Sequence, residues 1–199
     1  MTAARSKLPT YLVLFRGINV GGKNKVPMYE LKALLTELGF QDVRTYIQSG
    51  NAIVRSELTA ESIARKIEKA LPTRFKLDTE LIRVLVLARA DLEAAIDDRP
   101  EGFGDQPGMY HSDAIFLMGV DAAAAMTAFS PKEGVDAVWP GDGLIYSQRL
   151  SAQRTKSRLN RIASSPHYKS MTIRSWQTTL ALMDLVKAVD DGEADGGAA

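Results

Sequence analysis

The order of apolar patterns along the chain restricts its fold more than any other feature. Between residues 11 and 87, short extended runs alternate with segments whose apolar residues recur at helical spacing. The predicted order is strand, helix, strand, strand, helix, strand, at residues 11–16, 27–38, 43–47, 51–56, 59–71 and 80–87. This βαββαβ order is typical of a ferredoxin-like unit, in which both helices cover one face of an antiparallel sheet.

A similar order recurs in the second half, after a predicted helix at 90–98 and a connector rich in glycine and proline at 99–108. The pattern predicts strands and helices in this order: strand 112–118, helix 121–128, strand 134–138, strand 144–149, helix 155–163, strand 170–173 and helix 175–189. We therefore expect an α+β fold of two tandem ferredoxin-like (βαββαβ) units with antiparallel sheets, plus a C-terminal helix. Thr59 and Ser175 are the expected N-caps of helices 59–71 and 175–189.

The predicted division follows the same pattern. Residues 1–9 form a flexible N-terminus, residues 10–90 the first unit, residues 91–189 the second unit with the C-terminal helix, and residues 190–199 a disordered tail.

Composition excludes several classes of site among the 199 residues. With no cysteine, the chain has no disulfide framework, no catalytic thiolate and no cysteine-ligated metal. Its two histidines, His111 and His167, lack the spacing of a metal motif, so we expect neither metal nor cofactor. No leader and no apolar run of about 18 residues is apparent. We expect a soluble cytoplasmic protein with no membrane partner.

Charge is sorted along the chain although the net charge is only +1. Residues 1–90 carry a net +7, residues 91–142 a net −9 and residues 143–183 a net +7 without any acid. Two interpretations stay open: the acidic segment folds back and neutralises the basic one, or the basic segment binds nucleic acid. On a helix at 155–163, the arginines of this segment would form one stripe: Arg154, Arg158 and Arg161.

The loop at 16–25, between the first strand and first helix, combines glycines, positive charges and polar donors. Glycines allow a ligand to approach the backbone, and a helix N-terminus carries unpaired N–H groups with a partial positive charge. In the predicted sheet, the hairpin at 48–51 and the segment at 73–76 reach the same edge. Together they predict an anion site.

A simpler interpretation is that these glycines only allow positive φ and that residues 48–51 form a tight hairpin. No GxGxxG or Walker A pattern is present. Arg174 precedes the C-terminal helix and could meet an anion there, whereas Trp176 is either a core anchor or a stacking platform. The candidate ligand-binding residues are Arg16, Gly17, Asn19, Gly21, Gly22, Lys23, Lys25, Gln48, Ser49, Gly50, Asn51, Arg174 and Trp176.

Three ungapped stretches resemble a known family: FRGINVGGKNKVPMYELKALL, GFQDVRTYIQSGNAIV and, near the C-terminus, MTIRSWQTTLALMDL. They are similar to the bacterial domain-of-unknown-function family numbered 1697, and they occur in the same order. The resemblance implies tandem ferredoxin-like units and no assigned activity. Where the family has asparagine before the tryptophan, this chain has Ser175. If the asparagine of the family binds a ligand, Ser175 alters that contact. If the asparagine caps the helix, Ser175 serves nearly as well.

The leading hypothesis is a module that binds a small anionic ligand, such as a nucleotide or phosphorylated metabolite. Nucleic-acid binding is the alternative, although strand 51–56 lacks the aromatic residues with which an RRM stacks bases. An enzyme is a further alternative. It would use Arg16, Lys23 and Arg174 as electrostatic stabilisers and Tyr46 or His111 for proton transfer. The catalytic residues, and the oligomeric state, stay unassigned at this stage.

Overall fold

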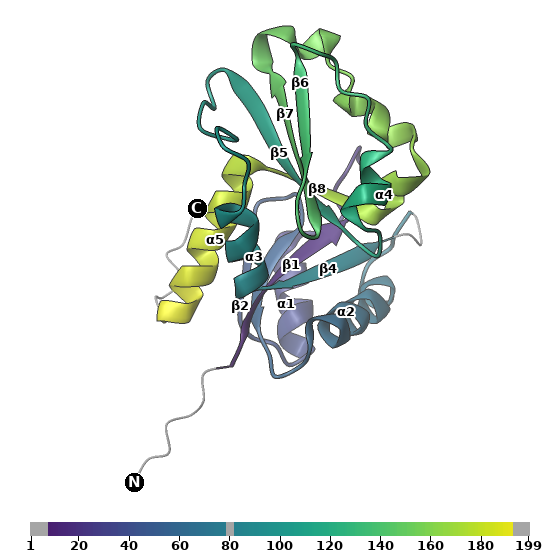
Figure 1. Cartoon of the computed structure of the whole chain (residues 1–199). Helices are drawn as coiled ribbons and strands as arrows, with labels where there is room; N and C mark the ends of the chain where they lie inside the picture. Colours follow the sequence, from purple (N-terminus) through teal and green to yellow (C-terminus); the bar gives the residue numbers. More distant parts are fainter. Residues whose placement is uncertain (1–7, 79–81, 193–199) are drawn as a thin grey trace. The chain divides into compact units, whose positions relative to one another are not determined.

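The computed structural model describes residues 8–78 and 82–192. It shows an α+β fold with two four-stranded antiparallel sheets and a C-terminal helix (Figure 1). Contacts group the chain into two compact units: residues up to Leu92 with those from Leu182 onward, and residues Glu93–Ala181. The C-terminal helix, which was expected to lie wholly in the second unit, groups with the first unit from Leu182 onward. The predicted flexible segment 1–9 and tail 190–199 lie mostly outside the described residues.

The first unit contains the six predicted elements. They are β1 (Thr10–Arg16), α1 (Met28–Glu37), β2 (Gln41–Tyr46), β3 (Asn51–Arg55), α2 (Ala60–Arg74) and β4 (Arg83–Ala88). The strand order is β2-β3-β1-β4, and every neighbouring pair is antiparallel. The Thr59 hydroxyl accepts the N–H of Ser62 at 3.3 Å, which confirms the predicted cap of α2.

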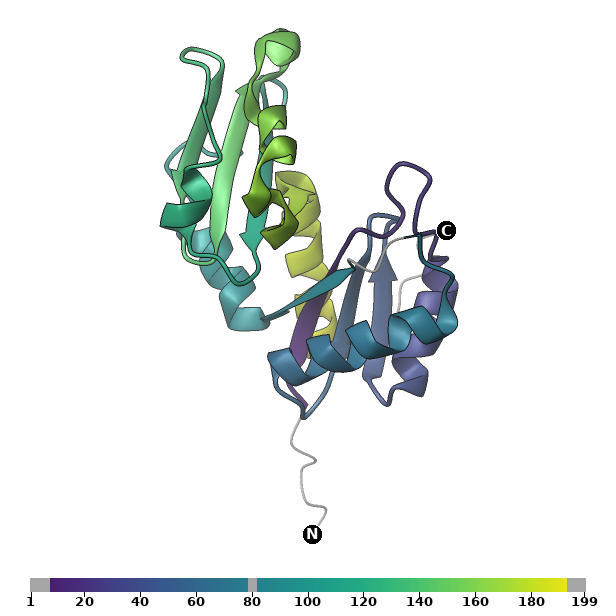
Figure 2. The same ribbon diagram turned by 90° about the vertical axis from the view of Figure 1, so that its right-hand side faces the viewer.

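The two helices of this unit pack on one face of its sheet (Figure 2). Side chains alternate along a strand, so Val13 and Phe15 of β1 face the helices. They bury Leu31 and Leu35 of α1 and further apolar residues of α2. On the opposite face, the next side chains of β1 and β3 are also buried: Leu12, Leu14 and Ile53.

The end of α5 (Trp176–Asp191) is bonded to the first unit. Asp190, which the sequence analysis placed in a disordered tail, lies in the last turn of this helix. Its carboxylate accepts the hydroxyl of Thr10 at 2.5 Å and Nη1 of Arg89 at 2.8 Å. The prediction of disorder is therefore wrong at Asp190, because charged and polar partners hold that carboxylate.

The second unit contains β5 (Tyr110–Leu117), α4 (Ala122–Met126), β6 (Asp136–Pro140), β7 (Leu144–Leu150) and β8 (Met171–Ser175), while α3 (Arg89–Asp97) leads into it. The sheet order is β6-β7-β5-β8. The hydroxyl of Ser175 accepts the N–H of Thr178 at 3.2 Å, as expected for the N-cap of α5. Among the described residues, no helix is long and apolar enough to cross a membrane.

The helix predicted at 155–163 is not formed. Three 3₁₀ helices take its place, η1 (Ser151–Lys156), η2 (Leu159–Ser164) and η3 (Pro166–Ser170). The hydroxyl groups of Ser157 and Ser165 accept backbone N–H groups two residues further on, at 3.3 and 3.2 Å. Such local bonds compete with a continuous α-helix, so the apolar spacing alone misled the prediction.

An aromatic cluster occupies one part of the second unit. Phe103 lies at its centre, with ring centroids 5.1 Å from Tyr146, 5.0 Å from Trp176 and 6.0 Å from Trp139. The Tyr146 hydroxyl donates to the carbonyl of Ala95 at 2.8 Å. This bond satisfies the polar end of a buried ring.

Candidate functional site

The tip of the 16–25 loop is a tight turn. Val20 and Lys23 form an isolated antiparallel bridge, and the Lys23 N–H donates to the Val20 carbonyl at 3.0 Å. Between them, Gly21 and Gly22 have φ of 59° and 77°. A two-residue turn with positive φ at both positions needs residues such as glycine, which explains this pair physically.

Asn19 fastens the loop to the neighbouring hairpin. Its side-chain amide donates to the carbonyls of Val26 at 2.9 Å and Gln48 at 3.0 Å, while its oxygen accepts the N–H of Val26 at 2.8 Å. The loop and the hairpin therefore meet at one edge of the first sheet, as the predicted topology requires.

Asn24 fastens the loop to the segment that follows α2. Its N–H donates to the Asp78 carboxylate at 2.6 Å, and the Asp78 N–H donates back to its side-chain oxygen at 2.7 Å. Its side-chain amide also donates to the carbonyl of Gly17 at 2.7 Å. Because this side chain is buried, the three bonds hold the base of the loop in one conformation.

The hairpin is equally well packed. Asn51 is fully buried, and its side-chain amide donates to the Tyr46 carbonyl at 3.0 Å and the Ser49 hydroxyl at 3.1 Å. Gly50 has φ of 80°, and a Cβ there would lie 2.8 Å from Cδ1 of Ile18. Asn51 and Gly50, two of the candidate ligand-binding residues, therefore have structural roles in this hairpin.

The charged side chains of the 16–25 loop itself are all cationic, while Asp78, which bonds Asn24, is an exposed acid at the base of the loop. Lys23 and Lys25 are exposed, and neither pairs with an acid in the described part of the chain. Arg16 is half-buried at the end of β1. Pro27 is the N-cap of α1 and offers no side-chain acceptor, so that helix begins without a side-chain cap. We call the loop 16–25, the hairpin 47–50 and the first turn of α1 the basic edge.

Apolar side chains are exposed on the same segments. Val20 is 66% exposed, Ile47 48% and Tyr29 74%. Ile47 also has φ of 47°, a conformation that a β-branched residue rarely adopts and that costs free energy. Strain of this kind is concentrated at functional sites more often than elsewhere.

Arg174 and Trp176 belong to the second unit, where both are buried. Arg174 donates to the Thr172 hydroxyl at 3.0 Å and the Ile173 carbonyl at 2.8 Å. Burial lowers the pKa of Arg174 to about 10. Trp176 is 4% exposed and packs against Phe103, which favours its interpretation as a core anchor.

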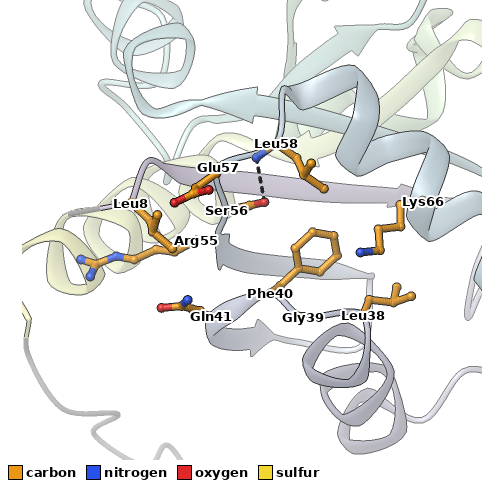
Figure 3. A pocket seen from close by; sticks show the side chains of 10 residues that line it. All are labelled: Leu8, Leu38, Gly39, Phe40, Gln41, Arg55, Ser56, Glu57, Leu58 and Lys66. Carbon is orange, nitrogen blue, oxygen red and sulfur yellow. Dashed lines mark hydrogen bonds between the residues drawn. The ribbon is translucent and has the colours of Figure 1, made fainter. Parts of the chain in front are cut away.

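A cavity of about 740 Å³ lies in the first unit, where β3 ends and α2 begins (Figure 3). The ring of Phe40 forms part of its wall, with Nζ of Lys66 5.7 Å from the ring centroid. Arg55 also lines it, but its guanidinium is bound by Asp42 at 3.1 Å and by the end of α5. Sequence reasoning missed this cavity because its lining comes from chain segments far apart in the sequence.

The basic stripe expected on a helix at 155–163 is absent. Arg154 lies in η1 and Arg161 in η2, and Arg158 stands between the two 3₁₀ helices. All three are exposed, and the N–H of Arg158 donates to Asp136 at 2.8 Å. The helical geometry that supported nucleic-acid binding is therefore wrong.

The two residues considered for proton transfer lie in different units. Tyr46 ends β2 and is half-buried, whereas Nε2 of His111 in β5 lies 3.1 Å from the Asp113 carboxylate. Burial raises the pKa of Asp113, although His111 and Arg149 partly offset that effect. Among the described residues, no group of three or more acidic or histidine side chains is arranged to hold a metal ion.

Comparisons with known proteins give a family and a fold. The family described as "Protein of unknown function (DUF1697)" matches residues 8–146. A conserved bacterial protein from Streptococcus pneumoniae has a similar solved structure, with a TM-score of 0.72 and 26% sequence identity. The alignment covers 90% of this chain and 99% of that one. A search of proteins with curated descriptions finds no match.

Proposed function

The chain belongs to the DUF1697 family, and we propose that it binds a small anionic ligand, a nucleotide or a phosphorylated metabolite, at the basic edge. One observation carries the proposal. Lys23 and Lys25 project from a loop that Asn19 and Asn24 hold in place, and neither lysine makes an ion pair with an acid of the described residues. Charges on a fixed scaffold bind with a smaller loss of conformational entropy than charges on a flexible one.

The chemistry of the edge suits a phosphate. Ammonium groups interact with phosphate as point charges. The Gln48 side chain is exposed beside them. Glu30 in the first turn of α1 accepts the Tyr29 hydroxyl at 2.9 Å, and its charge would disfavour a ligand placed directly over that turn. We therefore place the anion between the two lysines and the hairpin.

We also infer that each unit is ferredoxin-like. The supporting feature is that both sheets have the equivalent strand order, with the first and third strands of each unit in the centre. In this arrangement the loop after the first strand and the following hairpin lie at the same edge, which is the placement that the proposed site requires.

The test is ligand-dependent thermal stability, followed by calorimetry. Inorganic phosphate, ADP and a sugar phosphate are titrated against the full chain. A ligand at 100 times its Kd should add about 2.7 kcal/mol to the free energy of unfolding. The variants Lys23→Gln and Lys25→Gln should each weaken binding, while Lys69→Gln, at an exposed position of α2, should not.

If none of the three compounds stabilises the protein, the proposal is contradicted. Equal weakening by the Lys69→Gln control would also contradict it, because the effect would then reflect net charge rather than the basic edge. Binding should also weaken as salt is increased, since exposed charges are screened.

A further inference from the structure

We propose that the second unit binds a free α-amino acid with an apolar side chain, in a cavity between its sheet and the 3₁₀ helices η2 and η3. The cavity has a volume of about 260 Å³, below the roughly 300–1,000 Å³ typical of sites for drug-sized ligands. It lies within one unit and is separate from the basic edge. Figure 2 shows the short helical turns along one side of this sheet.

Strand register divides the cavity into a polar end and an apolar end. Asp113 of β5 is the direct partner of Ser147 in β7, and Arg149 lies two residues further along the same face. Two residues along β5 in the other direction, Ile115 pairs with Ile173 of β8. The cavity thus has a charged head region on one side and a branched aliphatic wall on the other.

The apolar wall is completed from above the sheet. Leu159 and Ile162 of η2 are buried and belong to the same apolar cluster as Ile115. With Ile173, these side chains also line the cavity. A branched aliphatic group of the ligand would therefore exchange part of its contact with water for contact with these apolar side chains.

The polar end contains hydrogen-bond donors that the described part of the chain does not satisfy. Ser147 is 2% exposed, and its hydroxyl makes no hydrogen bond there. The Arg149 side chain is 15% exposed, and its ion pair with Asp113, at 3.6 Å, is too long for a hydrogen bond. Both side chains line the cavity, so their O–H and N–H groups can donate to an acceptor bound there. A carboxylate fits, because guanidinium groups bind carboxylates with two parallel bonds.

The charges around Arg149 show why a carboxylate alone is not enough. Asp113 lies on one side, and Asp136 is the strand partner of Arg149 on the other. One oxygen of Asp136 is buried without a hydrogen-bond partner. A simple carboxylate would bring a third negative charge to one guanidinium, whereas a simple amine would leave Ser147 and Arg149 unsatisfied.

A zwitterion satisfies both requirements. The ammonium group of an α-amino acid would pair with Asp113, whose carboxylate is 14% exposed and also bonded to His111. The carboxylate of the ligand would then accept from Arg149 and Ser147. The branched side chain would lie against Ile115 and its neighbours, which favours ligands of the size of leucine or isoleucine.

Isothermal titration calorimetry on the full chain tests this assignment with four compounds. L-Leucine is the positive probe, 4-methylpentanoate lacks its ammonium group, 3-methylbutylamine lacks its carboxylate, and glycine lacks its side chain. We expect leucine to bind at least tenfold more tightly than each of the others. Leucine is titrated up to about 10 mM, a concentration above the dissociation constants that metabolite sites usually show. If no heat of binding is measured, the proposal is overturned. Equal affinity for any truncated compound also overturns it.

Variants locate the site. Ser147→Ala and Arg149→Gln should each raise the Kd for leucine at least tenfold, and Arg154→Gln, an exposed arginine nearby in the sequence, should leave it unchanged. If Arg149→Gln fails to fold, Ser147→Ala decides, because it removes only one oxygen atom. Unchanged leucine affinity in Ser147→Ala, with the melting temperature of the unliganded protein preserved, places the amino acid elsewhere and overturns the assignment.

Discussion

Asp190 should stabilise the protein through its bonds to the first unit. It accepts the Thr10 hydroxyl at 2.5 Å and Nη1 of Arg89 at 2.8 Å, and Nη2 of Arg55 lies 3.8 Å away. Arg55 also donates to the carbonyl of Val189. The Asp190 side chain is 21% exposed, so these interactions are partly shielded from solvent.

The variant Asp190→Asn removes the charge and keeps the volume. Its single carbonyl oxygen can accept one of the two hydrogen bonds, so the variant loses one bond of a charged group and the attraction to Arg55. A hydrogen bond to a charged group is worth about 1.5–3 kcal/mol, so we expect a loss of about 2 kcal/mol. For a chain of this size, that lowers the melting temperature by about 4–8 °C.

The effect should depend on pH in a defined direction. Burial alone would raise the pKa of Asp190, but hydrogen bonds from Arg89 and Thr10, with the charges of Arg89 and Arg55, lower it. The unfolded-state pKa is about 3.9, so the stabilisation is complete above about pH 4. It is lost as pH falls through the lower folded-state value, because the carboxylate then becomes protonated.

Urea unfolding of the wild type and Asp190→Asn at pH 7, 5 and 3 measures both effects. Asp191→Asn is the matched control, since Asp191 is the next residue and is exposed. The difference from wild type should be largest at pH 7 and smallest at pH 3. If the loss at pH 7 is no greater than that of the control, or does not decrease at pH 3, the Asp190 carboxylate does not stabilise the protein in this way.

Three further substitutions test the packing of each unit, all by urea unfolding. Gly50→Ala should lower the free energy of unfolding by about 1–3 kcal/mol, more than Gly21→Ala does, because only at Gly50 is a steric clash added to the unfavourable φ. Equal losses in the two variants would argue against that clash. Tyr146→Phe should cost about 1–3 kcal/mol by leaving the Ala95 carbonyl unsatisfied, and no loss would show that water replaces the hydroxyl. Thr59→Ala should cost about 1 kcal/mol through loss of the α2 cap, whereas Thr59→Ser should cost little.

Much of the fold was predictable because the relevant interactions are local. Alternating and helical apolar spacing gave the order of elements, and the hydroxyl groups of Thr59 and Ser175 marked two helix starts that the structure confirms. The same reasoning failed at 155–163, because the bonds made by Ser157 and Ser165 do not change the apolar spacing. A competing local bond outweighed a weak helical preference there.

The candidate site in the first unit could also be predicted only in part. The glycine-rich and basic composition of the 16–25 loop is read directly from the sequence, and the predicted topology placed this loop beside the 48–51 hairpin. The internal hydrogen bonds of Asn19 and Asn51 depend on neighbours that the fold brings together, and the local sequence does not show them. A side-chain amide has the same donors in a core as in a binding site, and its neighbours decide which role it has.

The cavity in the second unit depended entirely on tertiary structure. Asp113 and Arg149 are far apart along the chain, in two predicted strands whose mutual register the sequence pattern does not fix. Strand pairing places them on one face of a sheet, where Nη1 of Arg149 lies 3.6 Å from Oδ2 of Asp113. The sequence determined the types of residue and their local structure, and long-range register decided which of them meet, because pairing between distant strands has no signature in local spacing.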